Sequence, residues 1–270
     1  MILFPNAKIN LGLNIVEKRK DGFHNLETLF YPINWCDILE INESKEFKFE
    51  SSGLLISGEL NDNLCVKAYY LLKDKFNLPP IHLHLHKVIP MGAGLGGGSA
   101  DASFTLLGLN ELFHLKLSKN ELISYAEKLG SDCAFFIHNQ ACLGKEKGNL
   151  LEPVVLNLSD YWIFLIFPNI GISTAQAFAG IKPHIPNQKI EEIIQKPLMN
   201  WKNTLKNDFE NSLFPLHPEL KQIKEALYKE GAVYASMSGS GSTLYGIFEN
   251  KPKLGSKFNN YQFFETILAK

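Results

Sequence analysis

The chain has 270 residues, 45% of them hydrophobic and 20% charged, which is enough to bury one large core or two modest ones and excludes a disordered protein. Its formal net charge of −1 excludes a broad cationic surface, so we expect no nucleic-acid partner. The first residues lack a signal-peptide pattern and no segment has the ~18 to 20 consecutive apolar residues of a spanning helix, so we expect a cytoplasmic protein that does not bind membranes.

The N-terminal part is predicted to begin as an antiparallel sheet. Apolar residues alternate with others over 8–15, so Lys8 and Asn10 lie on one face of a strand whose other face is apolar. Asp21-Gly22 favours a hairpin turn, and 23–33 is expected to return as the second strand. Further short strands are expected at 37–42 and 47–49.

The next part is predicted to pass from helix to strand to helix. Asn63 is expected to cap the first helix, and Pro79-Pro80 closes it. A strand is expected over 81–89. A glycine-rich run then opens an apolar helical stretch that reaches Phe113.

Two shorter helices are predicted after this stretch. The first begins with a capping box of Ser118 and Glu121 and has Gly130 in the C′ position. The second is expected to start at Ser131-Asp132 and to end at Ile137.

The C-terminal part is predicted to mix buried strands with helices. Strands are expected over 161–167, 233–237 and 244–248. One helix should follow Gly171-Ile-Ser-Thr174, and another should have Pro218 in its first position and Gly231 past its end. The irregular alternation indicates an α+β fold with a change of domain near Pro153, which gives domains 1–153 and 154–270.

The run from Pro90 to Asp101 is the most informative feature because glycines occupy positions 92, 94, 96, 97 and 98. Residues without a Cβ atom let a phosphate approach backbone N–H groups, and a helix N-terminus directly afterwards adds unpaired donors. The run matches G-x-G-x-x-G, but no acidic residue follows where a dinucleotide site needs one. The P-loop lysine is also absent, since Gly98 precedes Ser99. A flexible linker is the structural alternative, although the run lies between a predicted strand and a predicted helix.

Three motifs resemble, in order and spacing, those of the GHMP kinase superfamily: Pro5-x-Ala7-Lys8-Ile-Asn10-Leu, Pro90-Met-Gly-Ala-Gly-Leu-Gly-Gly-Gly-Ser99 and Ser238-Gly-Ser-Gly-Ser242. Three more narrow the resemblance to members that phosphorylate a cytidine-diphosphate-linked sugar alcohol in the non-mevalonate isoprenoid pathway: Asp21-Gly-Phe-His24, Leu129-Gly-Ser-Asp132 and Asn207-Asp-Phe-Glu210. The resemblance implies a two-domain α+β fold, with a ribosomal S5 domain 2-like N-terminal domain and a ferredoxin-like C-terminal domain. It also implies ATP and Mg²⁺ as cofactors, a small cytidine-diphosphate substrate, and a monomer or weak homodimer.

The same resemblance assigns roles to residues. Asp132 matches the base that takes the hydroxyl proton, and Lys8 matches the lysine that contacts this base and the transferring phosphoryl group. A nearby cation would keep such a carboxylate ionised beside phosphates. ATP is expected on Pro90, Met91, Gly92, Ala93, Gly94, Leu95, Gly96, Gly97, Gly98, Ser99 and Ala100. The acceptor is expected on Asn10, Phe23, His24, Thr174 and Phe178, with cytosine between the two phenylalanine rings and His24 at its polar edge.

Some residues keep a second interpretation. Asp132 could instead cap a helix through its carboxylate. Ser99 could cap a helix, bind Mg²⁺, or do both. Three histidines lie on one strand face and are compatible with a metal site: His82, His84 and His86. No nearby carboxylate completes such a site, so we expect these histidines to be solvated or hydrogen-bonded and to bind no metal. The four cysteines show no C-x-x-C spacing and are expected to stay reduced.

Two other functions stay open. One is another GHMP kinase, which acts on homoserine, mevalonate or a sugar. The Phe23-His24 element, which is expected to bind cytidine, distinguishes this chain from such a kinase. A non-catalytic nucleotide sensor on the same fold should have lost its lysine or its base, whereas Lys8 and Asp132 are both present. The chain after Phe248 departs from this family, because Pro252 and Gly255 weaken the expected final helix.

Overall fold

The computed structural model describes residues 1–268 and divides into two compact units. The first unit contains Met1–Ala7, Trp35–Met91 and Gly96–Gln140, and the second contains Lys8–Asn34, Gly92–Leu95 and the chain from Ala141 onward. These units do not coincide with the expected halves 1–153 and 154–270. Most of the first hairpin belongs to the second unit, because its second strand pairs with a strand that lies more than a hundred residues later.

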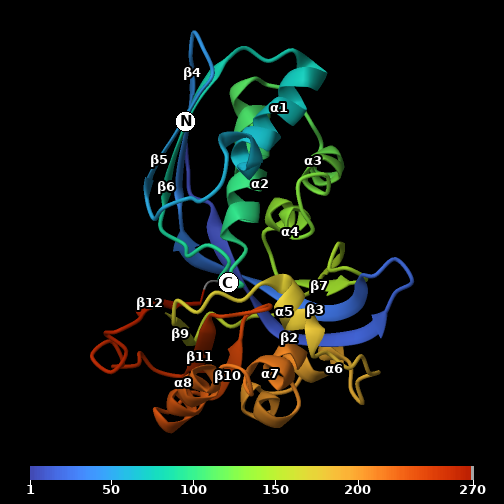
Figure 1. Ribbon diagram of the computed structural model, residues 1–270, viewed down its shortest axis with the longest axis vertical. Helices are drawn as coiled ribbons and strands as arrows, with labels where there is room; N and C mark the ends of the chain where they lie inside the picture. The colour runs from blue at the N-terminus through green and yellow to red at the C-terminus, as the bar shows by residue number, and fades with distance from the viewer. Residues whose placement is uncertain (269–270) are drawn as a thin grey trace. The chain divides into compact units, whose positions relative to one another are not determined.

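The first unit is a sheet with four helices packed on it. Its strand order is β1-β4-β6-β5, and only β5 and β6 run parallel. Figure 1 shows α1 to α4 beside this sheet. The strands are β1 (Ile2–Leu3), β4 (Ile38–Glu43), β5 (Lys48–Gly53) and β6 (Ile81–Lys87). The four α-helices are α1 (Leu64–Phe76), α2 (Gly97–Leu112), α3 (Lys119–Ala126) and α4 (Cys133–His138), and a short 3-10 helix, η1 (Leu60–Asp62), precedes α1.

Local sequence explains most of these elements. In β6 the apolar residues at odd positions are buried and the intervening histidines are less so, as a period of two predicts. Asn63 caps α1 by accepting a hydrogen bond from Cys65 N at 2.9 Å, and Ser118 and Glu121 form the predicted capping box of α3. Gly130 was expected in the C′ position of α3, and this expectation is wrong: the helix ends at Ala126.

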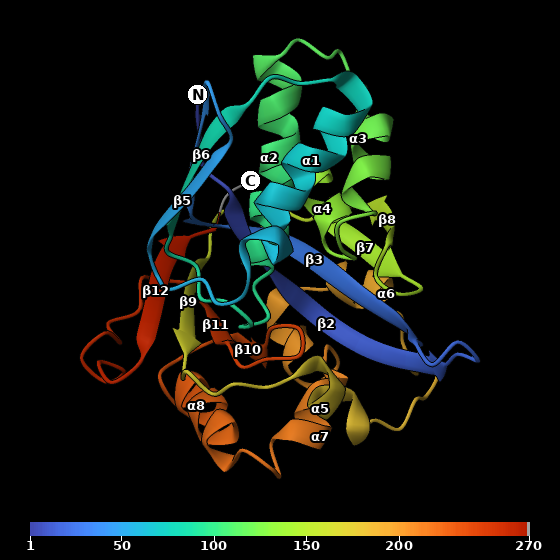
Figure 2. The same ribbon diagram turned by 45° about the horizontal axis from the view of Figure 1, so that its top comes forward.

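The second unit contains two sheets. The first has the order β2-β3-β7-β8, and the long hairpin of β2 and β3 is visible in Figure 2. The second has the order β10-β11-β9-β12 and is antiparallel throughout. The strands of the first sheet are β2 (Asn6–Lys18), β3 (His24–Cys36), β7 (Cys142–Lys145) and β8 (Leu150–Pro153). Those of the second are β9 (Trp162–Phe167), β10 (Tyr234–Met237), β11 (Leu244–Phe248) and β12 (Gln262–Ile267).

Helices cover the core of this second unit. The helix α8 buries Leu220, Ile223 and Leu227, and Pro218 is in its first turn as predicted. This helix spans Pro218–Lys229, and the other helices of the unit are α5 (Thr174–Ala179), α6 (Ile190–Ile194), η2 (Leu198–Asn203) and α7 (Asp208–Leu213). After Phe248 the described residues form the strand β12 (Gln262–Ile267) and no further helix. Over residues 1–268, every helix is too short or too polar to cross a lipid bilayer.

Candidate active site

Lys8 is held in a fixed orientation on β2. It is buried, and its backbone N–H donates to Leu95 O at 2.9 Å. Its ammonium donates to Asn10 Oδ1 at 2.6 Å and to Gly94 O at 3.1 Å, and lies 5.3 Å from the centre of the Phe30 ring. The predicted same-face relation of Lys8 and Asn10 is therefore confirmed. It brings the ammonium to the first half of the glycine run.

Asn10 orients this lysine rather than standing open to a ligand. Its amide nitrogen donates to Thr28 Oγ1 at 2.9 Å, and Thr28 donates in turn to Gly12 O at 2.6 Å. This chain fixes which end of the amide faces Lys8, since the amide oxygen must be the acceptor. Thr28 has no motif that marks it in the sequence. Its role depends on the pairing of two strands. Direct contact of Asn10 with the acceptor stays a prediction.

The loop 238–242 packs against the glycine run within the second unit. Ser238 Oγ donates to Gly94 O at 2.7 Å, and a Cβ atom on Gly94 would overlap the carbonyl oxygen of Ser238. Gly94 also has φ +78°, a conformation that side chains disfavour. Asn207 supports this loop by donating to Met237 O and Gly239 O, both at 2.8 Å. Gly94 is therefore needed for the close contact between the glycine run and the loop 238–242.

The second half of the glycine run starts α2 in the first unit. Gly96 is the N-cap with φ +70° and offers no side-chain cap to the first turn. A Cβ atom on Gly97 would lie 2.8 Å from Lys87 Nζ, whereas one on Gly98 would have only Leu64 Cδ1 within 4 Å, at 4.0 Å. The two glycines therefore serve different purposes. The absence of a side chain at Gly97 makes room for Lys87, and its absence at Gly98 leaves the space toward Leu64 open.

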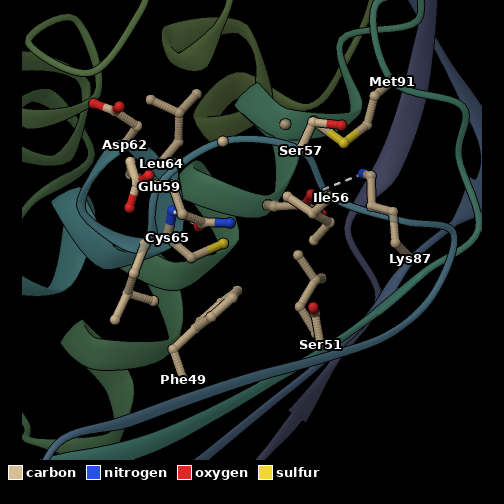
Figure 3. A pocket seen from close by; sticks show the side chains of 16 residues that line it. Phe49, Ser51, Ile56, Ser57, Glu59, Asp62, Leu64, Cys65, Lys87 and Met91 are labelled. Carbon is tan, nitrogen blue, oxygen red and sulfur yellow. Dashed lines mark hydrogen bonds and ion pairs between the residues drawn. The ribbon is translucent and has the colours of Figure 1, made fainter.

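Gly98 borders a cavity of about 350 Å³ in the first unit. Figure 3 shows that Phe49, Leu64 and Cys65 line one side of this cavity and that Lys87 and Met91 line the other. The segment 56–65 supplies much of its wall, including the polar Ser57, Glu59 and Asn63. The size and the mixture of apolar walls with a few polar groups are typical of small-molecule sites.

Asp132 lies directly before α4 and is half-buried. Its side chain makes no capping hydrogen bond to the helix, so the alternative of a simple cap is not supported. Ser103 Oγ lies 2.7 Å from Cys133 O and 2.8 Å from Ser99 O, and it therefore couples the start of α4 to the first turn of α2. Burial raises the pKa of the neighbouring Cys133 thiol to about 11, which keeps this cysteine protonated near neutral pH.

The aromatic residues expected for cytosine lie in the second unit. Phe23 is 58% exposed at the hairpin turn, with Lys147 Nζ 4.5 Å from its ring centre. His24 stacks on Phe178 with ring centres 4.7 Å apart and an interplanar angle of 20°. The structure thus places the imidazole, rather than an open slot, against Phe178. Thr174 is exposed at the first position of α5.

Burial and the charge of Lys18 lower the pKa of His24 below its ordinary value. The imidazole is therefore neutral near pH 7 and presents one donor and one acceptor nitrogen.

The three histidines of β6 have hydrogen-bonding partners on β5. His82 Nε2 lies 2.7 Å from Glu50 Oε2, and Ser52 Oγ lies 3.1 Å from His84 and 2.9 Å from His86. Among the described residues, no group of three or more acidic, histidine or cysteine side chains has a geometry suited to a metal ion. The four cysteines are all free.

Comparison with known proteins gives matches along nearly the whole chain. The family model described as GHMP kinases N terminal domain matches residues 63–140, and that described as GHMP kinases C terminal matches residues 188–262. A 4-diphosphocytidyl-2-C-methyl-D-erythritol kinase of Cytophaga hutchinsonii is 54% identical and covers 94% of each chain. One of Bacteroides thetaiotaomicron is 55% identical and covers 92% of each chain.

Solved structures agree with these matches. A crystal structure of a 4-(cytidine 5′-diphospho)-2C-methyl-D-erythritol kinase has a TM-score of 0.85, 28% identity and 98% coverage of both chains. The mevalonate kinase of Methanococcus jannaschii has a TM-score of 0.75 at 16% identity, with 100% of this chain and 98% of that chain covered. The second likeness shows a shared fold alone.

Proposed function

Because the chain belongs to the GHMP kinase family, and within it to the 4-diphosphocytidyl-2-C-methyl-D-erythritol kinases, we propose that it transfers the γ-phosphoryl group of ATP to the 2-hydroxyl of that diphosphocytidyl sugar alcohol. The products are the 2-phosphate and ADP, in isoprenoid precursor synthesis by the non-mevalonate pathway. One observation of this chain carries the proposal furthest: the ammonium of Lys8 is fixed by Asn10 Oδ1 and Gly94 O beside the glycine run.

The glycine run and the neighbouring cavity fit ATP. The adenine ring is proposed to occupy the cavity near Asn63 and Met91, since about 350 Å³ between apolar walls suits a planar base. The phosphates are proposed to bind the N–H groups of the first turn of α2, which Gly98 leaves accessible. Ser99, in this first turn, is the proposed protein ligand of Mg²⁺. When bound, the ion neutralises part of the triphosphate charge.

Asp132 is the proposed general base. Its carboxylate takes the proton of the 2-hydroxyl while the hydroxyl oxygen forms a bond to the γ-phosphorus and the bond from that phosphorus to the bridging oxygen of ADP breaks. Lys8 is proposed to stabilise the negative charge on the transferring phosphoryl group. The hydrogen bonds to Asn10 and Gly94 hold its ammonium in one place before the substrates bind, so little reorganisation is needed during the reaction.

The cytidine group is proposed to stack on Phe178, with Phe23 closing over its other face. Because the His24 ring covers Phe178 at 4.7 Å, cytosine reaches that face only after the imidazole moves aside. We propose that His24 then pairs with the polar edge of the base, where cytosine differs from uracil.

An acceptor panel tests this function. The purified protein is given ATP, Mg²⁺ and one acceptor at a time: the diphosphocytidyl sugar alcohol, its uridine analogue, homoserine or mevalonate. When each acceptor is supplied at low concentration, we expect ADP to form only with the cytidine acceptor. Phosphorus NMR of that product should show one new phosphate monoester, at the 2-position. Preferential use of homoserine or mevalonate would instead support another kinase of this family. ATP binding without turnover of any acceptor would support a sensor.

A further inference from the structure

A buried ion cluster lies beneath the glycine run in the first unit. Lys87 ends β6, Asp37 precedes β4, and Asp101 lies in α2. Their exposed fractions are 2%, 0% and 1%. Lys87 Nζ donates to Asp101 Oδ2 at 2.8 Å and also to Asp37 Oδ2. One ammonium therefore joins two carboxylates from segments that are far apart in the sequence.

The cluster holds both ends of the glycine run. On the side before the run, Asp37 Oδ1 accepts hydrogen bonds from Val88 N at 2.6 Å and from Ile89 N at 2.8 Å. On the side after the run, Asp101 ties α2 to Lys87. The backbone that enters the run and the helix that leaves it are thus fixed to the same three side chains.

Gly97 lies directly over this cluster. A Cβ atom at this position would approach Lys87 Nζ to 2.8 Å and Ile89 Cγ2 to 3.0 Å, which is closer than packed atoms tolerate. Lys87 and Asp101 also border the cavity proposed for adenine, together with Gly98. The cluster is therefore in contact with the first turn of α2, whose N–H groups are the proposed phosphate donors.

Stability alone does not account for this cluster. Buried ions lose their hydration, and well-packed apolar residues of similar volume are often at least as stable. Two buried carboxyl groups share one ammonium, and among the described residues Asp101 Oδ1 has no hydrogen-bond partner. Burial raises the pKa of Asp101, which is the opposite of what a well-compensated ion pair shows. What the cluster provides that apolar packing does not is a directional link between Lys87 and two named backbone segments.

We propose that Lys87 is a positioning residue for ATP: through Asp37 and Asp101 it sets the spacing between the end of β6 and the start of α2, and thereby the geometry of the phosphate-binding N–H groups. This inference rests on the proposed function of the glycine run. Lys87 acts through the backbone it holds and does not take part in the transfer of the phosphoryl group.

The test compares ATP affinity with stability. Lys87→Met keeps most of the side-chain volume but removes the ammonium. We expect it to weaken ATP binding by about 10- to 100-fold, measured by calorimetry with ATP and Mg²⁺ and no acceptor. KM for the cytidine acceptor should change less than about threefold. Leu109→Ala is the control, because Leu109 lies in the same helix and is fully buried in the core of this unit. It should lower the melting temperature without changing the affinity for ATP.

A second variant separates positioning from folding. Lys87→Met combined with Asp37→Asn and Asp101→Asn removes all three charges, so it should recover the stability that Lys87→Met loses. Its affinity for ATP should stay reduced. Recovery of both stability and affinity, or a Lys87→Met protein that binds ATP as well as wild type, would overturn the inference while leaving the proposed kinase intact. A wild-type protein that binds no ATP would overturn both.

Discussion

The two regions proposed to bind substrates differ in how far the chain fixes them in advance. Around the glycine run, Lys8, Asn10 and Gly94 are joined by hydrogen bonds of 2.6 and 3.1 Å, and the two acidic residues of the Lys87 cluster are buried. In the cytidine region Phe23 is 58% exposed and His24 covers the face of Phe178. On the proposed assignments, the first region is organised before ATP binds, whereas the second would have to rearrange for cytosine to reach the face of Phe178 that His24 covers. Substitutions in the first region should therefore act on the rate or on the affinity for ATP, and those in the second on KM for the cytidine acceptor.

Asp132→Asn should give the largest loss. An amide cannot take the hydroxyl proton, so kcat should fall by about 10²- to 10⁴-fold while both substrates still bind. Lys8→Met should also lower kcat, and the double variant should be scarcely worse than the poorer single one, because residues that act as a unit are not additive. Steady-state kinetics with calorimetric binding checks this. A near wild-type kcat in Asp132→Asn would remove the base assignment.

Adjacent glycines of the run should respond differently. Gly98→Val adds atoms on the side of the cavity, so we expect ATP binding to weaken by about 10- to 100-fold with little change in melting temperature. Gly97→Val forces Lys87 and Ile89 to move, so it should lower stability as well as affinity. Gly171→Val is the control, since a Cβ atom there meets nothing within 4 Å. Equal losses of stability in the first two variants would contradict the distinction between them.

Phe178→Ala should act on the acceptor alone. Loss of one stacking contact, worth about 1 to 3 kcal/mol, should raise KM for the cytidine acceptor about five- to hundredfold. KM for ATP should stay nearly unchanged, and Phe23→Ala should behave in the same way. The comparison between regions would break down if either variant changed KM for ATP as strongly as KM for the acceptor.

The smallest effect concerns pH. Since burial and Lys18 lower the pKa of His24 below 6.5, its imidazole is neutral near pH 7 and becomes protonated only in more acidic solution. A protonated ring has two donors and no acceptor, so it can no longer pair with cytosine through both kinds of group. KM for the cytidine acceptor should be constant from about pH 7 to 8 and rise a few-fold below about pH 6. In His24→Gln the acidic rise should disappear.

Local signals predicted the elements whose causes are local. The alternation over 8–15 and the capping box at Ser118 led to the correct strand and helix start, because backbone and side-chain geometry within a few residues decide both. The prediction that Gly130 takes the C′ position of α3 was wrong, because this helix ends four residues earlier, at Ala126. The assignment of the first hairpin to the second unit depends on pairing of β3 with β7, which no short window of sequence contains.

The same limit applies to the site. The glycine run was evident, but the reason for Gly97 was not, since it depends on Lys87 lying beneath it. Asp37, Lys87 and Asp101 meet through tertiary packing, and although Asp101 ends the glycine-rich run, no sequence pattern links the three residues. His24 and Phe178 were expected around cytosine, yet their direct stacking is a property of the fold before a ligand binds.

The most direct test is a competition between cytidine- and uridine-diphosphate forms of the sugar alcohol, with ATP and Mg²⁺, in wild type and in His24→Ala. Stacking alone does not distinguish the two pyrimidines, so the ratio of their kcat/KM values reports on recognition of the base edge. We expect wild type to prefer the cytidine acceptor strongly and His24→Ala to lose much of this preference while KM for ATP is unchanged. Equal use of both acceptors by the wild-type enzyme would contradict the cytidine assignment.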